Sequence, residues 1–249
     1  MTSFLLALQF LTIIPIKIKR FDKSKFINSM IYFPVVGLLL ALFLAAINNL
    51  FLFLGFNSIV TNVILVIALI VITGGMHLDG LSDTFDALVS SKDKERMLEI
   101  MRDPHCGVMG ILSVICVILL KISFLSSLNP AHKINALILM CVLSRAALVF
   151  LIFMFPYTRK EGKGKIFSEE VNLKIINIVG IITLICAGAS FKIKGLLTMA
   201  VATLVAFIFA KFITKKVGGI TGDSLGAANE LTEVTVLVTL CFLEKGGVI

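Results

Sequence analysis

Three aspartates follow one another at helical spacing in the segment 74–86, and they are the residues of this sequence best suited to chemistry. Asp79, Asp83 and Asp86 stand at positions i, i+4 and i+7, so on a helix they fall within about 60° of one another. Carboxylates this close repel each other unless a cation lies between them. Hard oxygen ligands suit Mg²⁺, which bridges carboxylates and substrate phosphates. The spacing predicts a magnesium–diphosphate site; a solvated acidic helix end is the alternative.

His77 precedes this stripe by two residues. Its imidazole could act as a general base or orient a metal ligand, and a merely polar helix end is an equally good interpretation. We therefore include His77 with Asp79 and Asp83 among the candidate catalytic residues.

A second polar segment, rich in glycine, covers residues 218–233. Its glycines, including Gly222, allow the backbone to approach a phosphate closely. Asp223 is a further candidate metal ligand, and either Asp223 or Ser224 could cap the helix that follows.

Two more candidates in this segment, Asn229 and Glu230, are expected to contact substrate. They lie at the start of an apolar run, as does Glu233, where buried polar side chains are costly without a role. Asn229 and Glu233 are also i, i+4 partners. A capped helix with surface acids is the alternative interpretation.

Arginines are candidates for balancing phosphate charge. Arg102 stands beside Asp103 ahead of an apolar run, and we predict that both contact substrate. Arg159 ends the run Pro156-Tyr157-Thr158-Arg159 and is a second candidate phosphate clamp, although a purely topological role for it is as good an interpretation.

Arg145 falls near the middle of an apolar run, where an isolated charge costs at least a few kcal/mol. We expect it to face the protein interior. There it must pair either with a carboxylate, such as Glu230 or Glu233, or with a substrate phosphate, in which case it is catalytic.

The elements that position these residues must be membrane helices. Of the 249 residues, 58% are hydrophobic and 15% are charged, whereas about a quarter are charged in a soluble domain. The mean hydropathy is +1.05. The uncharged stretch 26–78 is 53 residues long, and a membrane helix needs about 20. The composition excludes a soluble, disordered or disulfide-scaffolded chain and predicts one all-α polytopic membrane domain, residues 1–249.

About seven transmembrane helices are predicted from the apolar runs. They are 31–54, 58–76, 107–128, 134–155, 173–190, 195–213 and 231–243. The last of these is short for a full span. Residues 4–16, closed by Pro15, are also short, so we expect a re-entrant or interfacial helix there.

Basic residues set the predicted orientation. Lys and Arg fall mainly in four segments: 17–25, 92–102, 159–165 and 211–216. Placing all four on the cytoplasmic side of the plasma membrane alternates correctly with seven spans, and the Lys192/Lys194 turn is the one exception. Seven of the fifteen acids lie on this side, between Asp79 and Asp103. The net charge of +8 therefore marks topology rather than nucleic-acid binding.

Five cysteines are scattered without metal-ligand spacing, which predicts reduced, buried thiols rather than a disulfide framework. The N-terminus lacks the basic and cleavage-site features of a removable signal peptide.

The motifs in combination resemble the cobalamin synthase family, whose members are adenosylcobinamide-GDP ribazoletransferases. The resemblance covers nearly the whole chain. Its segments are Gln9–Thr12 with Ile14-Pro15, Tyr32–Gly37, His77–Asp83 extended by Asp86, Arg102-Asp103 with Gly107, Pro156–Arg159, and Thr221–Asp223 with Asn229-Glu230.

The resemblance implies a Mg²⁺-dependent transferase that closes the lower nucleotide loop of vitamin B12. A ribose hydroxyl of α-ribazole, or of its 5′-phosphate, would attack the cobinamide-linked phosphorus of adenosylcobinamide-GDP, and GMP would leave. The implied partners are these small molecules and the lipid bilayer, with no nucleic acid; a homo-oligomer or assembly with other cobalamin-pathway enzymes stays open.

Three other classes are weaker alternatives. A CDP-alcohol phosphotransferase would need a D-G-x-x-A-R arrangement, but Thr84-Phe85 follow Asp83. A prenyltransferase would need a repeated aspartate-rich motif, whereas the second polar segment mixes Asp, Asn and Glu. A secondary transporter would place its carboxylates in mid-span rather than at one membrane face.

Overall fold

Long apolar runs in the sequence become long helices in a computed structural model, which describes residues 2–17, 22–90, 93–158, 166–167 and 171–245. These residues form helices alone, apart from one isolated bridge between Tyr157 and Ile220. The elements are α1 (Thr2–Leu11), α2 (Lys23–Ile27), η1 (Asn28–Tyr32), α3 (Phe33–Phe53), α4 (Ser58–Thr73), α5 (Met76–Ser90), α6 (Lys94–Ile100), α7 (Val108–Ser127), η2 (Pro130–His132), α8 (Lys133–Met154), α10 (Leu173–Val217) and α11 (Gly222–Lys245).

The predicted class, an all-α polytopic membrane protein, is confirmed. The helices α3, α7 and α8 begin and end within two residues of the runs predicted for them. Five helices of the described chain are long and apolar enough to cross a membrane, or six if the bent pair α4–α5 is one span. The predicted count of seven is therefore not confirmed.

The count of five or six takes α10 as one helix, but its 45 residues are two helices that meet at a break at Phe191 and Lys192, where Lys192 has a φ of 53°. These two helices correspond to the predicted 173–190 and 195–213. Beyond the break Gly195 lies directly against the carbonyl oxygen of Ala187. An unbroken helix would hold residues eight apart roughly 12 Å from each other, so the chain reverses direction here.

The predicted helix 58–76 also changes direction before its end. Gly74 and Gly75 have φ values of 65° and 69°, a region that L side chains rarely adopt. They end α4 at Thr73 and turn α5 by 90° relative to it. The acidic stripe therefore lies on a helix of its own.

The last helix begins nine residues earlier than the predicted 231–243. Thr221 and Ser224 cap it reciprocally: Ser224 N donates to Thr221 Oγ1 at 3.1 Å, and Thr221 N donates to Ser224 Oγ at 2.8 Å. The cap residue is thus Thr221, with Ser224 as its helical partner, and not Asp223. As a result Asp223 and Glu230 lie on one continuous helix.

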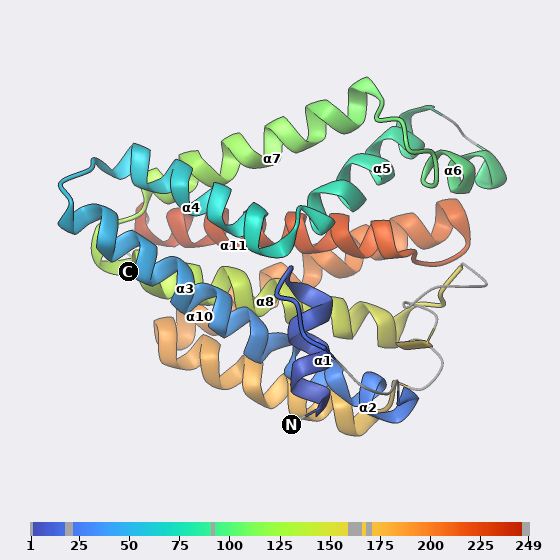
Figure 1. The fold of residues 1–249 in the computed structure, drawn as a ribbon, viewed down its shortest axis with the longest axis horizontal. Helices are drawn as coiled ribbons and strands as arrows, with labels where there is room; N and C mark the ends of the chain where they lie inside the picture. The colour runs from blue at the N-terminus through green and yellow to red at the C-terminus, as the bar shows by residue number, and fades with distance from the viewer. Residues whose placement is uncertain (1, 18–21, 91–92, 159–165, 168–170, 246–249) are drawn as a thin grey trace.

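The N-terminal residues form a short helix, α1, that Figure 1 shows lying across the direction of the long helices. After α1 the chain runs extended, and Ile13 N donates to the Ile72 carbonyl at 2.9 Å. Phe10 of α1 packs edge-on against Phe167 at 5.3 Å. Whether this segment is interfacial or re-entrant stays a prediction.

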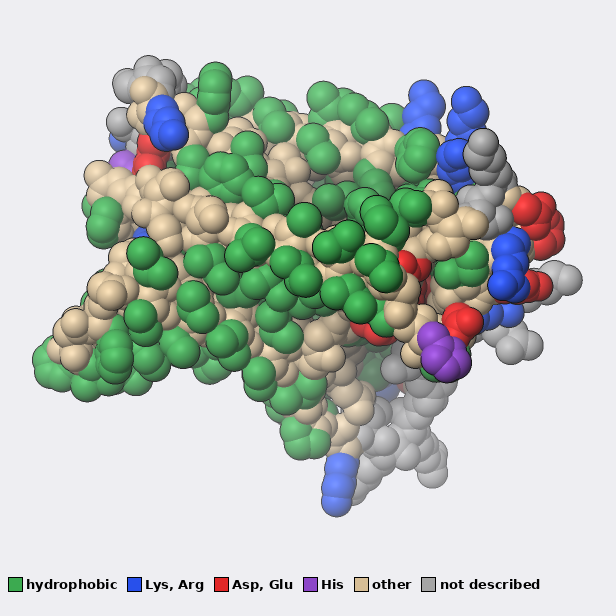
Figure 2. Space-filling model, turned by 90° about the horizontal axis from the view of Figure 1, so that it is seen from above, with side chains coloured by type: hydrophobic (Ala, Val, Ile, Leu, Met, Phe, Trp, Pro, Cys, Tyr) green, Lys and Arg blue, Asp and Glu red, His purple; other side chains and the backbone are tan. Residues whose placement is uncertain are grey.

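The two innermost long helices are α8 and α11. Helix α8 packs against α3, α10 and α11, and α11 packs against α5, α7, α8 and α10. Figure 2 shows hydrophobic side chains over the middle of the molecule and charged side chains gathered toward its ends. In Figure 1, α2, α6 and the junction of α10 with α11 all lie toward the end opposite the C-terminus. The described parts of three predicted basic segments, which lie in α2, in α6 and at the end of α10, are therefore found toward one end of the molecule.

All five cysteines are free, as predicted. Their predicted burial is confirmed for Cys141 and Cys241 and is wrong for Cys106 and Cys116, which are exposed. Cys116 lies on α7, whose outer face is apolar, so burial in the protein is not needed to keep its thiol out of water.

Candidate functional site

The two polar segments meet where α5 crosses α11. A Cβ placed on Gly80 would lie 2.7 Å from the carbonyl oxygen of Asp223, and one placed on Gly226 would lie 3.1 Å from that of His77. Only glycine permits backbones to approach this closely. The crossing brings α5, the helix that carries the stripe, against the start of α11, and Asp223 follows Gly80 by 143 residues in the chain.

Three of the four predicted metal ligands are accessible at this crossing. Asp79 is exposed, and Asp83 and Asp223 are half-buried. Among the residues described, no group of three or more His, Cys, Asp or Glu side chains is already arranged to hold a metal ion. The predicted Mg²⁺ site therefore stays a prediction.

Asp86, the fourth predicted metal ligand, has a different task. Its Oδ2 accepts a hydrogen bond from Gly107 N and its Oδ1 one from Gly110 N, both at 2.7 Å. The carboxylate thus caps the N-terminus of α7, where the helix dipole favours a negative charge. Because Asp86 is also buried, we leave it out of the proposed metal site.

The Arg102-Asp103 pair lies in the exposed turn between α6 and α7. Asp103 Oδ1 accepts hydrogen bonds from His105 N at 2.9 Å and His105 Nδ1 at 2.6 Å. These hydrogen bonds from His105, the backbone N–H first, hold the pKa of Asp103 below its usual value. Substrate contact by Arg102 and Asp103 stays a prediction.

The segment that begins at Pro156 joins the same end of the molecule. Ile220 N donates to the Pro156 carbonyl at 2.8 Å, and Thr158 N donates to the Ile220 carbonyl at 2.9 Å. This bridge places Tyr157 beside Gly222, where a Cβ would be 3.8 Å from the tyrosine hydroxyl. Gly222 is exposed at the start of α11, whereas Arg159 lies outside the described residues.

Behind the crossing, a group of buried charges joins α7, α8 and α11. Lys121 Nζ donates to Glu230 Oε2 at 2.6 Å and also to Glu233. Arg145 donates to the other oxygen of Glu233. All four side chains are at most 5% exposed, and two cations balance two anions. We call these four residues the buried charge cluster.

This cluster decides the alternatives for Arg145. The residue faces the interior and pairs with Glu233, so the expected pairing with a carboxylate is confirmed. Asn229 Nδ2 also donates to Glu233, at 3.2 Å, as the i, i+4 spacing suggested. Arg145, Asn229 and Glu230 are thus enclosed in the bundle, behind the accessible aspartates rather than among them.

His77 links the crossing to the buried charge cluster. It is 4% exposed and lies within electrostatic reach of Arg145, Glu233 and Lys121. Its burial fits a supporting role better than direct contact with a substrate that arrives from water.

Lys121 was missed by sequence reasoning. It is the single charge in the apolar run 107–128, and that isolation is the signal that could have identified it. Its partners, Glu230 and Glu233, lie more than 100 residues away in sequence, so their identity was not readable locally.

Comparison with known proteins gives matches that cover nearly the whole chain. Residues 3–241 match the model of the family described as cobalamin-5-phosphate synthase. A protein of Thermoanaerobacter sp. (strain X514) named adenosylcobinamide-GDP ribazoletransferase is 37% identical over 96% of this chain and 95% of its own length. Proteins of the same name from Clostridioides difficile (34% identical, 98% of each chain) and Acetivibrio thermocellus (40%, 94% and 95%) are also similar. No solved structure gives a significant match.

Proposed function

Because the chain belongs to the cobalamin-5-phosphate synthase family, we propose that its α5–α11 crossing carries the adenosylcobinamide-GDP ribazoletransferase reaction. The chain is an enzyme of the last steps of cobalamin assembly. The observation that supports this location is the contact of Gly80 with Asp223, which brings the polar segments 74–86 and 218–233 to one accessible place.

The reaction exchanges one bond to phosphorus for another. A ribose hydroxyl oxygen of α-ribazole, or of its 5′-phosphate, forms a bond to the cobinamide-linked phosphorus. The bond from that phosphorus to the oxygen of the GMP phosphate breaks, and GMP leaves with the electron pair. The hydroxyl proton passes to a carboxylate oxygen, for which we propose the exposed Asp79. Such a transfer requires positioning and charge neutralisation above all.

The accessible aspartates fit a magnesium ion. Asp79, Asp83 and Asp223 offer hard oxygen donors, and Mg²⁺ usually takes only one or two carboxylates together with water and substrate phosphates. A closed protein cage is therefore not required. When bound, Mg²⁺ would neutralise charge on the diphosphate. Arg102 is exposed and lies a few residues before the start of α7. It is our candidate for neutralising the remaining negative charge of the phosphates.

The buried residues support this site from within. The buried charge cluster holds α7, α8 and α11 together, and α11 carries Asp223. His77 lies on α5 together with Asp79 and within electrostatic reach of the cluster. We propose that His77, Arg145, Asn229 and Glu230 fix the position of the aspartates and do not touch the reacting atoms.

We further propose that the protein lies in the plasma membrane with this site on the cytoplasmic side, because basic segments favour that side. Two single-cysteine variants test this on a cysteine-free background, Phe56→Cys in the α3–α4 turn and Lys211→Cys near the end of α10. An impermeant maleimide added to intact cells should label position 56 and not position 211. The reverse pattern would overturn the orientation.

The function is tested with purified protein in liposomes. With adenosylcobinamide-GDP, α-ribazole and Mg²⁺, we expect GMP release together with formation of adenosylcobalamin. Omitting α-ribazole should abolish GMP release, which separates transfer from hydrolysis. Replacing α-ribazole with its 5′-phosphate identifies the preferred acceptor. Absence of GMP release with either acceptor would contradict the proposed activity.

A further inference from the structure

The outer faces of α8 and α10 enclose two hollows, of about 450 Å³ and about 220 Å³. Both are lined by Ala147, Phe150, Met199 and Thr203, so they form one continuous feature, which we call the α8–α10 groove. Its lining is apolar apart from threonine. It lies in helices that are long and apolar enough to cross a membrane, so hydrocarbon rather than water is its natural surrounding.

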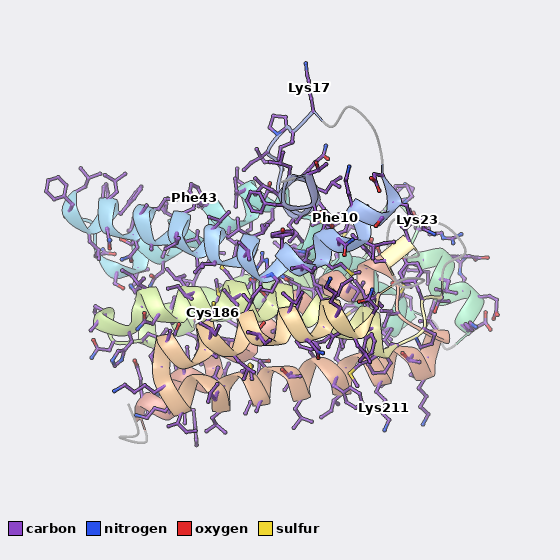
Figure 3. The ribbon with its side chains drawn as sticks, turned by 90° about the horizontal axis from the view of Figure 1, so that it is seen from below. Phe10, Lys17, Lys23, Phe43, Cys186 and Lys211 are labelled. Atoms are coloured by element: carbon purple, nitrogen blue, oxygen red, sulfur yellow. The ribbon has the colours of Figure 1, made fainter. Side chains whose placement is uncertain are left out.

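One end of this groove continues into a basic stripe on α10. Phe207 lines the groove, and Lys211 and Lys215 follow it at intervals of four residues, so the three side chains lie on one face of the helix. Both lysines are exposed, and Figure 3 shows Lys211 directed away from the bundle. An apolar groove thus ends at two ammonium groups.

The charge of these lysines is not balanced on their own helix. The 45 residues of α10 contain no Asp or Glu. Within the described part of the chain, neither Lys211 nor Lys215 forms a salt bridge. A basic pocket beside a groove between membrane helices suits an anionic lipid headgroup.

We infer that the α8–α10 groove binds an acyl chain of an anionic phospholipid whose headgroup phosphate is held by Lys211. The apolar walls recognise the chain, and any phospholipid would satisfy them. The lysines supply the selectivity, because a net negative headgroup gains more from them than a zwitterionic one does. This site is separate from the aspartates of the α5–α11 crossing.

Native mass spectrometry of the protein released from nanodiscs tests this inference. The nanodiscs contain phosphatidylglycerol and phosphatidylcholine in equal amounts, so that retention of each lipid is compared in one sample. We expect the wild-type protein to retain phosphatidylglycerol at least fivefold over phosphatidylcholine. Lys211→Gln should abolish that preference, and Thr203→Phe, which fills the groove, should reduce retention of both lipids.

Two control variants separate the site from general effects of charge and bulk. Lys192→Gln removes an exposed lysine at the break in α10, and Ile208→Phe adds an aromatic ring on a lipid-facing position outside the groove. Both should retain lipid as the wild-type protein does. Equal retention of the two lipids by the wild type, or equal loss in Lys192→Gln and Lys211→Gln, would overturn the inference.

Discussion

Gly80 of α5 lies against the backbone of Asp223 in α11, with room for a hydrogen and no room for a methyl group. The contact is backbone to backbone, so a side chain at position 80 cannot be accommodated by a change of rotamer. The distance between the carboxylates of the two helices is therefore set by a glycine.

We predict that Gly80→Ala pushes α5 away from α11. The added Cβ would lie 2.7 Å from the Asp223 carbonyl oxygen, and overpacking of this kind costs about 1–3 kcal/mol. Transfer activity should fall at least about tenfold, since small misplacements of catalytic groups are costly. Thermal unfolding in detergent and GMP release measure the two effects. Gly188→Ala, where nothing lies within 4 Å, is the matched control and should lose neither.

The accessible aspartates should be needed for metal-dependent turnover. Asp83→Asn and Asp223→Asn each remove a charge while keeping the shape, and we expect turnover at limiting Mg²⁺ to fall by about 100-fold. Thermal stability should change little. Glu95→Gln removes an exposed carboxylate in α6, at the same end of the molecule, and should stay active. Normal turnover of both aspartate variants across a Mg²⁺ titration would make the acidic stripe a solvated helix end.

Asp86 should matter for stability through its cap on α7. Asp86→Ala removes the acceptor for Gly107 N and Gly110 N, and hydrogen bonds to charged groups contribute about 1.5–3 kcal/mol. Asp86→Asn keeps one acceptor and should be intermediate. Asp93→Asn, at the exposed cap of α6, is the control with a smaller loss. Equal melting temperatures for all three variants would contradict the cap assignment.

Lys121 should be needed to balance Glu230 and Glu233. Lys121→Met leaves a buried excess of negative charge, which is expected to cost about 3–5 kcal/mol. The double variant Lys121→Met/Glu230→Gln again has one cation, Arg145, for one anion, and should recover most of that loss.

The two Lys121 variants also test whether Lys121 sets the position of α11. If the lysine sets the placement of α11, the double variant should melt near the wild-type temperature and still need several-fold more Mg²⁺ for half-maximal turnover. Full recovery of both properties would mean that Lys121 contributes charge balance alone.

The sequence indicates the helices well where an apolar run has clear ends. The bounds of α3, α7 and α8 follow from the lengths of their apolar runs, because the thickness of the bilayer's hydrocarbon core sets how many apolar residues a spanning helix needs. Changes of direction are visible only where they interrupt an apolar run. The break at Phe191 and Lys192 falls between the predicted runs 173–190 and 195–213. Gly74-Gly75 lies inside the predicted run 58–76, and hydropathy does not carry the backbone angles that bend the chain there.

The sequence predicts which residues form the site better than it predicts the role of each. The two polar segments were identified from motif and spacing, and the structure brings them together. The carboxylate stripe assigns Asp86 to metal binding, and the lone buried cation leaves Arg145 between a carboxylate and a substrate phosphate. Their partners, the α7 backbone and Glu233, come from other helices, so only the tertiary structure decides both roles.

Lys121 is synthesised 109 residues before Glu230, its partner in the last helix. At about 5–20 residues per second, the ribosome needs roughly 5–20 seconds to bridge that gap. An unpaired ammonium in hydrocarbon costs at least a few kcal/mol, so during this interval α7 cannot settle at its final depth unless the lysine reaches water. Membrane insertion of this chain is therefore completed by its C-terminal helix, and a nascent chain stalled before α11 should be a substrate for membrane quality control.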